Sequence, residues 1–265
     1  MKVRTMYSRA FQLLIAAAAC SSVAGADDYR ATALALDPVV YFSLDEATLA
    51  DPAVNLAVGA SSAGATGNGT YDAAGPEPLM PPLIPAPIGT SVRFGDNTLR
   101  TPQQITTAGA TGYTIAFWMR APANPTGPIN LVGTGATMYG FYAMVYLLTD
   151  GRVRAHAQVD SNFAQVDTDI AVTDGAIHHI IARFSQPALA TNGLLEVFID
   201  GERHGQLVTT RNNIASNLAR LYVGRDLREP GSTLVTIDEV ALWNRALDAT
   251  ELDLLTGFLF RDGFE

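Results

Sequence analysis

The sequence predicts an all-β fold: a two-sheet antiparallel sandwich of the jelly-roll kind, with a short C-terminal helix. Three observations support this prediction. Beyond Gly89, short stretches rich in β-branched and aromatic residues recur at regular spacing. The dipeptides Asp150-Gly151 and Asp200-Gly201 join neighbouring stretches and are strong signals for tight hairpin turns. Helical periodicity is almost absent, and no repeat of solenoid or propeller length occurs. An antiparallel sandwich accommodates all three features.

The first 26 residues have the features of a secretory signal peptide. Three basic residues precede the apolar run 11–19, and the small residues 24–26 form a cleavage pattern. The run is too short to cross a bilayer, so we expect no membrane insertion. Cleavage after Ala26 would release an exported protein, either extracellular or periplasmic.

Cys20 is the only cysteine, and it lies inside this predicted signal segment. Lipoprotein anchoring through Cys20 is the less favoured alternative, because alanines occupy the preceding positions where such sites usually begin with leucine. After cleavage at Ala26 the chain would have no disulfide. A domain of this length can bury a core large enough to do without one.

The expected elements follow one another along a single domain, residues 27–257. Residues 29–36 predict one or two helical turns that Asp37-Pro38 ends. Residues 39–44 form a strongly apolar strand, whereas residues 47–90 are rich in small residues and proline and predict loops with little strand pairing. The strands expected after them are 91–94, 99–101, 113–120, 129–133, 139–148, 152–159, 164–172, 177–184, 194–199, 202–208, 218–223 and 234–243.

The strand 113–120 alternates most clearly. Its odd-numbered residues are all apolar and predict a core face, while Trp118 lies on the opposite face. We therefore expect both faces of this strand to be covered. The last strand is followed by Asp248 and Glu251, which predict a capping box for a short helix. Leu252 and Leu255 would dock this helix, which ends at Gly257.

Charge argues against two classes of partner. The formal net charge of −9 becomes about −12 when the predicted signal segment is removed, and Lys2 is the only lysine. No cluster of basic residues is present. Nucleic acid and anionic membrane surfaces are therefore not expected partners.

Five stretches resemble, in order, the motifs of LamG-like domains of the concanavalin A-type jelly-roll superfamily, to which laminin G domains and pentraxins are related. They are PVVYFSLDE (38–46), YTIAFWMR (113–120), IHHIIA (177–182), VFIDG (197–201) and IDEVALWNRALDATEL (237–252). The resemblance covers roughly residues 29–257. It implies a concanavalin A-like sandwich and leaves residues 258–265 as a short C-terminal tail of unknown role.

The resemblance also implies candidate calcium ligands. Related pentraxins use an Asp-Asn pair in a turn at the place of Asp96-Asn97, and calcium prefers carboxylate and carbonyl oxygens. Ordinary turn chemistry explains Gly95-Asp96-Asn97 as well and is favoured modestly. The acids at 160, 167 and 169 could add to a surface cation site.

Two acidic pairs form a second candidate, because the resemblance brings the first and last strands together. These pairs are Asp45-Glu46 and Asp238-Glu239. Neighbouring carboxylates repel unless a cation or an arginine lies between them. A calcium ion held by Asp45 and Asp238, or a network with Arg245 or Arg93, would meet this need equally well.

The pair His178-His179 does not predict a shared site. Adjacent residues on a strand point to opposite faces, so the two rings cannot meet on one metal or substrate. We expect one histidine to pack between the sheets and the other to face outward.

Catalytic motifs of the fold are missing. The E-x-D-x-x-E spacing of retaining glucanases does not occur, and Ala176-Ile177-His178 lacks the glutamine of the alginate-lyase strand. No nucleophile elbow, phosphate loop or zinc-protease motif is present. A divergent polysaccharide-degrading enzyme, a glycoside hydrolase or lyase, is the alternative to a non-enzymatic role.

The sequence therefore favours a secreted, non-catalytic recognition module. It would bind carbohydrate or an extracellular protein through loops at the rim of the sandwich, with calcium as the only expected cofactor. Tyr139, Tyr142 and Phe163 are the aromatic residues that would stack on a sugar, although ordinary packing explains each of them as well. A passive structural or adhesive role at the cell surface is a third hypothesis, and the oligomeric state stays open.

Overall fold

The computed structural model describes most of the chain between Ala26 and Gly257. The described residues are 26–57, 68–72, 79–84, 89–95, 98–101, 105–106, 112–123, 125–137, 140–159, 162–186, 192–209, 218–224 and 234–257. Most of the predicted signal peptide, the turn with Asp96 and Asn97, and the C-terminal tail lie outside them, so these assignments stay predictions.

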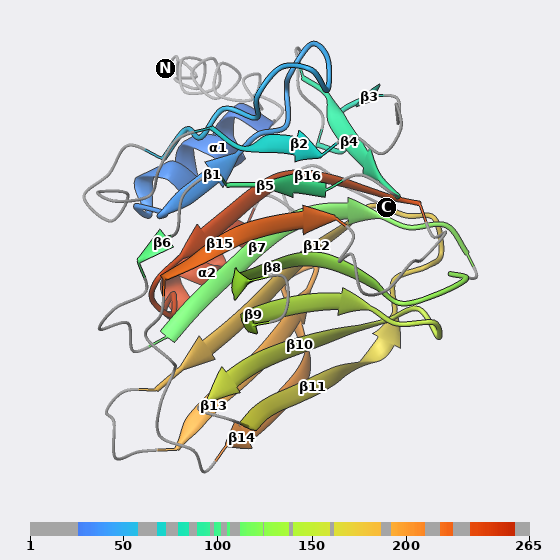
Figure 1. Cartoon of the computed structure of the whole chain (residues 1–265). Helices are drawn as coiled ribbons and strands as arrows, with labels where there is room; N and C mark the ends of the chain where they lie inside the picture. Colours follow the sequence, from blue (N-terminus) through green and yellow to red (C-terminus); the bar gives the residue numbers. More distant parts are fainter. Residues whose placement is uncertain are drawn as a thin grey trace, which may run out of the picture.

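The described strands form two antiparallel sheets (Figure 1). The first sheet has the order β14 (Glu202–Thr209), β13 (Gly193–Ile199), β12 (His178–Ser185), β7 (Gly112–Arg120), β16 (Val235–Trp243), β4 (Ser91–Phe94) and β3 (Leu79–Met80), with β1 (Val40–Phe42) beside β16. The second has the order β11 (Asn162–Ala171), β10 (Arg152–Val159), β9 (Gly140–Leu147), β8 (Ile129–Thr137), β15 (Leu218–Gly224), β5 (Thr98–Arg100) and β2 (Thr70–Asp72), with β6 (Ile105–Thr106) beside β15. The predicted two-sheet sandwich is confirmed.

Two helices accompany the sheets. Helix α1 (Ala26–Ala35) precedes β1 and ends where Asp37 adopts a positive φ of 57°. Helix α2 (Ala249–Thr256) has the predicted capping box: Asp248 accepts from the backbone N–H of Glu251, and Glu251 accepts from that of Asp248. Both predicted helices are therefore confirmed.

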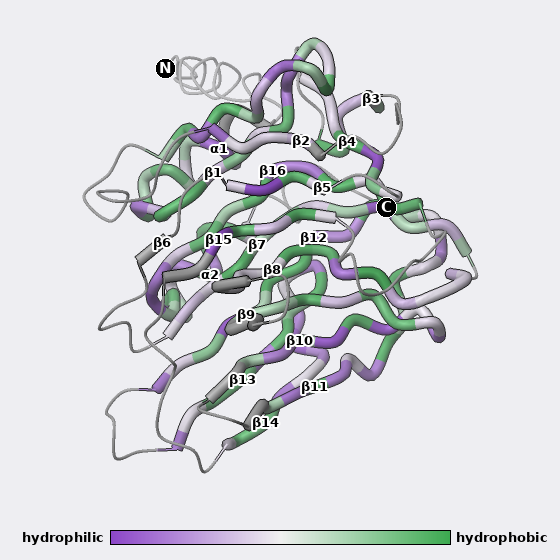
Figure 2. The backbone as a smooth tube through the Cα atoms, viewed as in Figure 1, coloured by the Kyte–Doolittle hydropathy of each residue, from purple (hydrophilic) through white to green (hydrophobic). Residues whose placement is uncertain are grey.

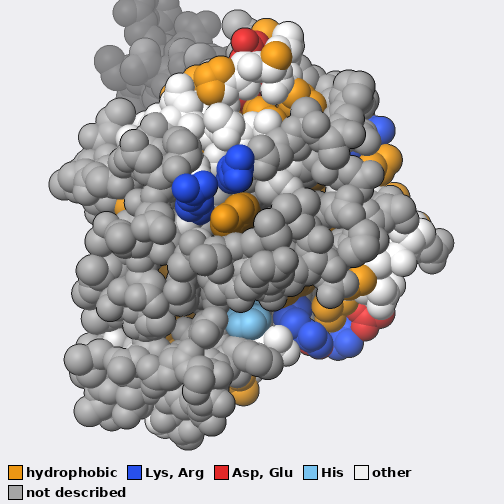
Figure 3. Space-filling view, viewed as in Figure 1, with side chains coloured by type: hydrophobic (Ala, Val, Ile, Leu, Met, Phe, Trp, Pro, Cys, Tyr) orange, Lys and Arg blue, Asp and Glu red, His pale blue; other side chains and the backbone are white. Residues whose placement is uncertain are grey.

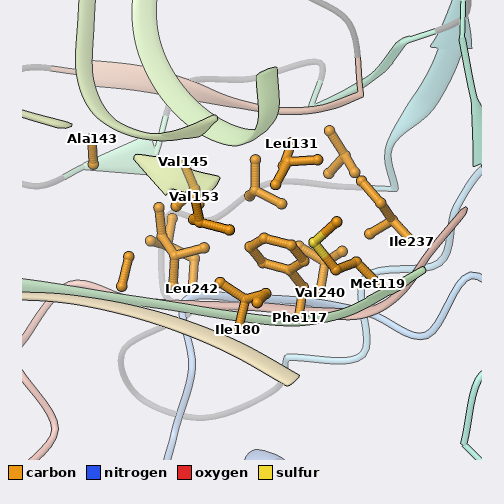
Figure 4. Close-up of a cluster of buried hydrophobic side chains, with 14 of the residues drawn as sticks. Phe117, Met119, Leu131, Ala143, Val145, Val153, Ile180, Ile237, Val240 and Leu242 are labelled. Atoms are coloured by element: carbon orange, nitrogen blue, oxygen red, sulfur yellow. The ribbon is translucent and has the colours of Figure 1, made fainter. Parts of the chain in front are cut away.

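The main core lies between the two sheets. Alternate residues of β7, β12 and β16 meet alternate residues of the second sheet, and Figure 2 shows the resulting mixture of hydrophobic and hydrophilic positions along the strands. The cluster in Figure 4 includes Phe117, Met119, Leu131, Val145, Val153, Ile180, Ile237 and Leu242. The predicted core face of 113–120 is confirmed by this cluster.

A second hydrophobic cluster lies on the opposite side of the first sheet. Trp118 and Trp243 project there and pack with Tyr29 and Ala33 of α1 and with Leu252 of α2. Leu83, Ile84 and other apolar residues complete the cluster. Both faces of β7 are thus covered, as the position of Trp118 predicted.

Both predicted hairpin turns are present. Gly151, between β9 and β10, has a φ of 80°. Asp200 and Gly201, between β13 and β14, have φ values of 51° and 87°. Two successive positive φ values define a turn whose twist matches that of the flanking strands. This requirement explains why glycine occupies the second position.

Three strands were not predicted, namely β2, β3 and β6. Each has only two or three residues and pairs along the side of a longer strand. Two or three residues are too few to show the alternation that predicts a strand, so their pairing depends on the neighbouring strand rather than on local pattern.

The two sheets approach each other closely at one side, where β14 and β11 are edge strands. A Cβ added at Gly205 would lie 3.2 Å from the carbonyl oxygen of Asp167, so the two backbones nearly touch there. A hydrogen bond of 2.8 Å joins His204 Nδ1 to Asp169 Oδ1 across the same gap. Within the described part of the chain, no helix is long and apolar enough to span a membrane.

Candidate functional site

A buried polar cluster lies where α1 meets the first sheet. Arg30 of α1 donates from Nη2 to Asp45 Oδ2 and to Glu239 Oε1, both at 2.6 Å. The hydroxyl of Tyr41 donates to the second oxygen of Glu239 through a very short contact. The cluster therefore connects the first helix, the first strand and the last strand.

An irregularity in β16 brings Glu239 into this cluster. The pairing of β16 with β7 shifts register between Asp238 and Ala241, and Glu239 has a φ of 50°. Such a bulge interrupts the alternation of side chains and redirects them. As a result the side chain of Glu239 is only 2% exposed and lies under α1.

The two predicted acidic pairs meet only in part. Asp45 and Glu239 share Arg30, whereas Asp238 accepts from the backbone N–H of Leu83 at 3.0 Å and from that of Glu239 at 2.9 Å. Glu46 turns elsewhere: it accepts from the N–H of Val54 at 3.0 Å and from the hydroxyl of Tyr71 at 2.9 Å.

The arginine of this network is Arg30 rather than either predicted partner. Arg245 instead contacts Glu251 at 2.6 Å and the carbonyl oxygen of Leu36 at 3.0 Å, which ties the start of α2 to the end of α1. Arg30 was missed because the sequence predicts its helix but not the sheet face on which that helix lies.

Burial dominates the acid–base properties of the cluster. It raises the pKa of Glu239 to about 7, although the adjacent Arg30 and the Tyr41 hydroxyl oppose the increase. Burial likewise raises the pKa of Asp238, and the neighbouring Glu239 adds to that rise. The pKa of Tyr41 is also raised, first by burial and then by the charge of Glu239.

The acids of the cluster bind an arginine and backbone amides. Among the described residues no group of three or more His, Cys, Asp or Glu side chains could hold a metal ion. The oxygens of Asp45 and Asp238 bind Arg30 and backbone amides, so an arginine network is present, and calcium at these residues stays a prediction. Asp96, Asn97 and Asp160 lie outside the described residues. Asp167 binds Arg154, and Asp169 binds His204.

The two histidines do not share a site, as predicted, but the buried one lies elsewhere than expected. His179 is under α1 on the outer side of the first sheet, not between the sheets. Its Nε2 lies 2.9 Å from the Tyr29 hydroxyl, and its ring stacks on Trp118 at 4.7 Å. Burial lowers the pKa of His179 to about 4, so the ring is neutral.

His178 lies near the end of β12 between two aspartates. Its Nδ1 is 2.7 Å from Asp200 and its Nε2 is 3.1 Å from Asp174. The hydrogen bond to Asp200 is the main cause of a raised pKa of His178. Both ring nitrogens are occupied, so His178 fixes the hairpin turn of Asp200 to the neighbouring loop.

The outer face of the second sheet differs from that of the first. Inward positions of β9, β10 and β15 belong to the core, so the alternate positions project outward. The half-buried residues at these positions are Arg100, Tyr146, Arg152, Arg154, His156, Arg220 and Tyr222. Figure 3, viewed from this side, shows arginine and histidine side chains on this face.

Two arginines of this face are already paired. Arg154 binds Asp167 through two hydrogen bonds of 2.5 and 2.9 Å, and Arg152 binds Asp150 at 2.7 Å. These arginines hold the pKa of Asp150 and that of Asp167 below their usual range. Both carboxylates are therefore ionised at neutral pH.

The predicted sugar-stacking residues belong to this sheet or its rim. Tyr139 lies outside the described residues. Phe163 in β11 pairs with Gln158 of β10, and Tyr142 in β9 precedes Ala143, which pairs with Ala157. The backbones of Tyr142 and Phe163 are therefore at the same end of the sheet. Their side chains lie outside what the structure describes.

A sequence model described as the concanavalin A-like lectin/glucanases superfamily matches residues 94–253. The match includes most strands of both sheets and begins within β4. The chain belongs to this superfamily. No curated protein sequence matches the chain significantly.

Solved structures support the concanavalin A-like fold. The binding domain of botulinum neurotoxin DC in complex with SialylT has a TM-score of 0.58 and 10% identity, covering 85% of this chain and 52% of that one. The binding domain of paraclostridial mosquitocidal protein 1 has a TM-score of 0.59 and 15% identity, covering 84% and 52%. The chain thus spans about half the length of these structures. At these identities the likeness concerns the fold alone.

Within the superfamily fold, the two sheet faces offer different chemistry. The outer face of the first sheet is closed by α1, α2 and residues 83–84, and its buried acids bind Arg30 and backbone amides. The outer face of the second sheet has partly exposed tyrosine, arginine and histidine side chains. Only the second arrangement offers side chains to a ligand without removal of a helix.

Proposed function

We propose that this protein is a secreted, non-catalytic recognition module. It binds a glycan or a protein ligand of the cell surface through the outer face of the second sheet and the adjoining rim. The observation that carries the proposal is the contrast between the two faces. Two helices cover the first, whereas Tyr146, Tyr222 and His156 are partly exposed on the second. Partly exposed tyrosines combine apolar area with a polar tip, which suits ligand binding.

The charges on this face favour binding over catalysis. A general acid in a glycoside hydrolase needs a raised pKa so that it holds a proton at neutral pH. Asp150 and Asp167 have lowered pKa values instead, because each binds an arginine. The described acids with raised pKa values are Glu46, Asp238 and Glu239. Asp238 and Glu239 lie beneath α1, and Glu46 is buried and binds the N–H of Val54 and the hydroxyl of Tyr71.

The comparisons support the same class of function at a coarse level. The two similar structures are binding domains, and one of them is in complex with SialylT. Export remains part of the proposal on the strength of residues 1–26 alone. Calcium assistance stays a prediction for Asp96 and Asn97, and binding that survives EDTA would exclude it.

A binding screen tests the proposal. The purified chain would be applied to an array of neutral and acidic oligosaccharides, and separately to intact cells. We expect binding to at least one of the two, weakened when Tyr222 is replaced by alanine. The matched control is the replacement of Phe198 by alanine, because Phe198 is a partly buried aromatic residue on the outer side of the first sheet, away from this face. Absence of binding to every glycan and to cells would overturn the proposal.

A further inference from the structure

Asn130 of β8 has a buried side-chain amide without a partner. The residue is 1% exposed, and neither Oδ1 nor Nδ2 makes a hydrogen bond. Buried polar groups are nearly always hydrogen-bonded, so an exception calls for a physical explanation. Leaving an amide in this state costs free energy that an apolar residue of the same shape would not cost.

Ordinary strand alternation places this amide on the outer side of the second sheet, just before a bulge in β8. The pairing with β9 shifts register between Asn130 and Val132, and the residues Ile129, Leu131 and Val132 all belong to the core. Asn130 lies opposite Tyr146, which is at an outward position of β9. Bulges of this kind redirect side chains and recur beside binding sites.

Gly133 makes room for the amide. A Cβ at Gly133 would lie 3.4 Å from Asn130 Oδ1 and only 2.7 Å from Met144 Cγ. Because Gly133 has no side chain, both the amide of Asn130 and the side chain of Met144 can lie over the backbone of β8 at this point. Glycine in a strand often marks such a close approach.

Tyr146 gives the amide an aromatic neighbour. Its hydroxyl donates to Met144 Sδ at 3.2 Å, which holds the side chain toward Met144 along β9. Next to Tyr146 across the sheet, Arg154 is neutralised by Asp167. The cross-strand neighbour of the amide is thus aromatic, and the arginine beyond it is paired.

We propose that Asn130 is the residue that selects the ligand of this face, and that the group it binds is a hydroxyl of a neutral glycan. The inference rests on the proposed function and adds to it the class of ligand. A carboxamide presents one acceptor and two donors without charge, and a sugar hydroxyl both donates and accepts. An anionic ligand would be better matched by an arginine than by an amide.

Burial of the amide has a kinetic consequence. A ligand must displace the atoms that cover Asn130 before it can bind there. Association that requires a conformational change is slower than the usual rate of protein association. We therefore expect slow association together with a strong dependence of affinity on Asn130.

The test uses the full chain and three proteins: wild type, Asn130→Leu and Asn130→Asp. Leucine keeps the shape of the side chain without its hydrogen-bonding groups, and aspartate keeps the shape but replaces the donor by a second acceptor. The probe is whichever neutral oligosaccharide binds the wild type most tightly on the array. Binding is measured by calorimetry and stability by thermal unfolding.

We expect both variants to bind the probe at least ~10-fold more weakly, which corresponds to about 1.4 kcal/mol. Asn130→Leu should at the same time raise the melting temperature by roughly 2–4 °C, because it removes an unpartnered buried amide. Binding of the probe by Asn130→Leu with unchanged affinity would overturn the inference and leave the proposed function standing. A lowered melting temperature in Asn130→Leu would also overturn it, since the amide would then have a partner in the free protein. If the wild type bound only acidic glycans or proteins, the assignment of a neutral glycan would fall, but the proposed function would not.

Discussion

At the scale of single residues, the cluster around Arg30 shows how one side chain can balance several buried acids. The guanidinium is only 21% exposed and lies between Asp45 and the almost fully buried Glu239. Bringing these charges out of water is costly, and the arrangement holds only because Tyr41 and backbone amides satisfy the remaining oxygens. Removing one member therefore matters more than removing a surface ion pair.

Replacement of Arg30 by methionine should destabilise the protein by about 3 kcal/mol, because it leaves Glu239 buried without its cation. The measurement is the free energy of unfolding in urea. The matched control is Arg152→Met, which removes a pair with Asp150 whose side chains are 40% and 49% exposed, and which should lower the free energy of unfolding much less than Arg30→Met. Equal costs for the two variants would contradict the role assigned to Arg30.

Glu239 also predicts a pH dependence of stability. Its pKa is about 7 in the folded protein and near the ordinary glutamate value of 4.5 when unfolded, so the folded state holds more protons between these two pH values. Stability therefore falls as the pH rises from about 4.5 to 7, and Asp238 acts in the same direction. In Glu239→Gln this contribution is absent, so melting temperature should depend less steeply on pH in that window.

The comparison of variant with wild type is needed because the histidines overlap this window. His156 and His179, whose pKa values are lowered to about 4, make stability rise with pH from 4 to 6.5. His178, with a raised pKa, makes stability fall at higher pH. The histidine contributions to stability are the same in wild type and in Glu239→Gln, so they cancel when the stability of the variant is subtracted from that of the wild type. If the difference in stability between wild type and Glu239→Gln did not change with pH, the raised pKa assigned to Glu239 would be refuted.

At the scale of elements, α1 is a cover for one face of the first sheet. Tyr29 and Ala33 are one helical turn apart and both fully buried, whereas Ala31 on the other side of the helix is exposed. The helix is fixed further by the contacts of Arg30 and by the indole N–H of Trp243, which donates to the carbonyl oxygen of Leu36 at 3.0 Å. Apolar packing therefore holds α1 against the sheet, and the hydrogen bonds fix its position there.

Replacement of Ala33 by glutamate should detach α1 without unfolding the sandwich. The two tryptophans of the chain, Trp118 and Trp243, both lie in the cluster beneath this helix. Quenching of tryptophan fluorescence by acrylamide should increase in Ala33→Glu, while the circular dichroism of the sheets is retained. Ala31→Glu is the control and should be quenched like the wild type. No increase in Ala33→Glu would argue against α1 as the cover of this cluster.

At the scale of the whole molecule, the sheets are held together by the shared core and by the close approach of β14 to β11. Replacement of Gly205 by valine should force these edges apart and cost roughly 1–3 kcal/mol, because a Cβ there already lies 3.2 Å from Asp167 and from Val166. His204→Ala removes only a contact to an exposed aspartate and should cost less than about 1 kcal/mol. Denaturant unfolding measures both; a greater cost for His204→Ala would contradict this view of the edge.

The sequence predicted the sandwich because its signals are local. The alternation in 113–120, the two Asp-Gly turns and the capping box of Asp248 each specify one element and agree with one another. Residues whose roles depend on distant partners were not predicted in this way. Arg30 meets Glu239 across more than 200 residues, and the close approach of Asn130 to Gly133 spans a bulge that no residue pattern predicts. The strands β2, β3 and β6 were likewise not predicted, because each forms only by pairing with another strand.

The pairing of β1 with β16 affects the order in which the protein can fold. Val40 pairs with Leu242, and the cluster beneath α1 needs residues of α2 as well. A growing chain emerges from its N-terminus, so α1 and β1 lack their partners in β16 and α2 until residues 235–256 have been made. Closing so long a loop is slow compared with forming local hairpins. If the chain is exported as its first residues predict, this delay would keep its N-terminal part without its sheet partner, and so suitable for threading through a translocation channel, until β16 has been made.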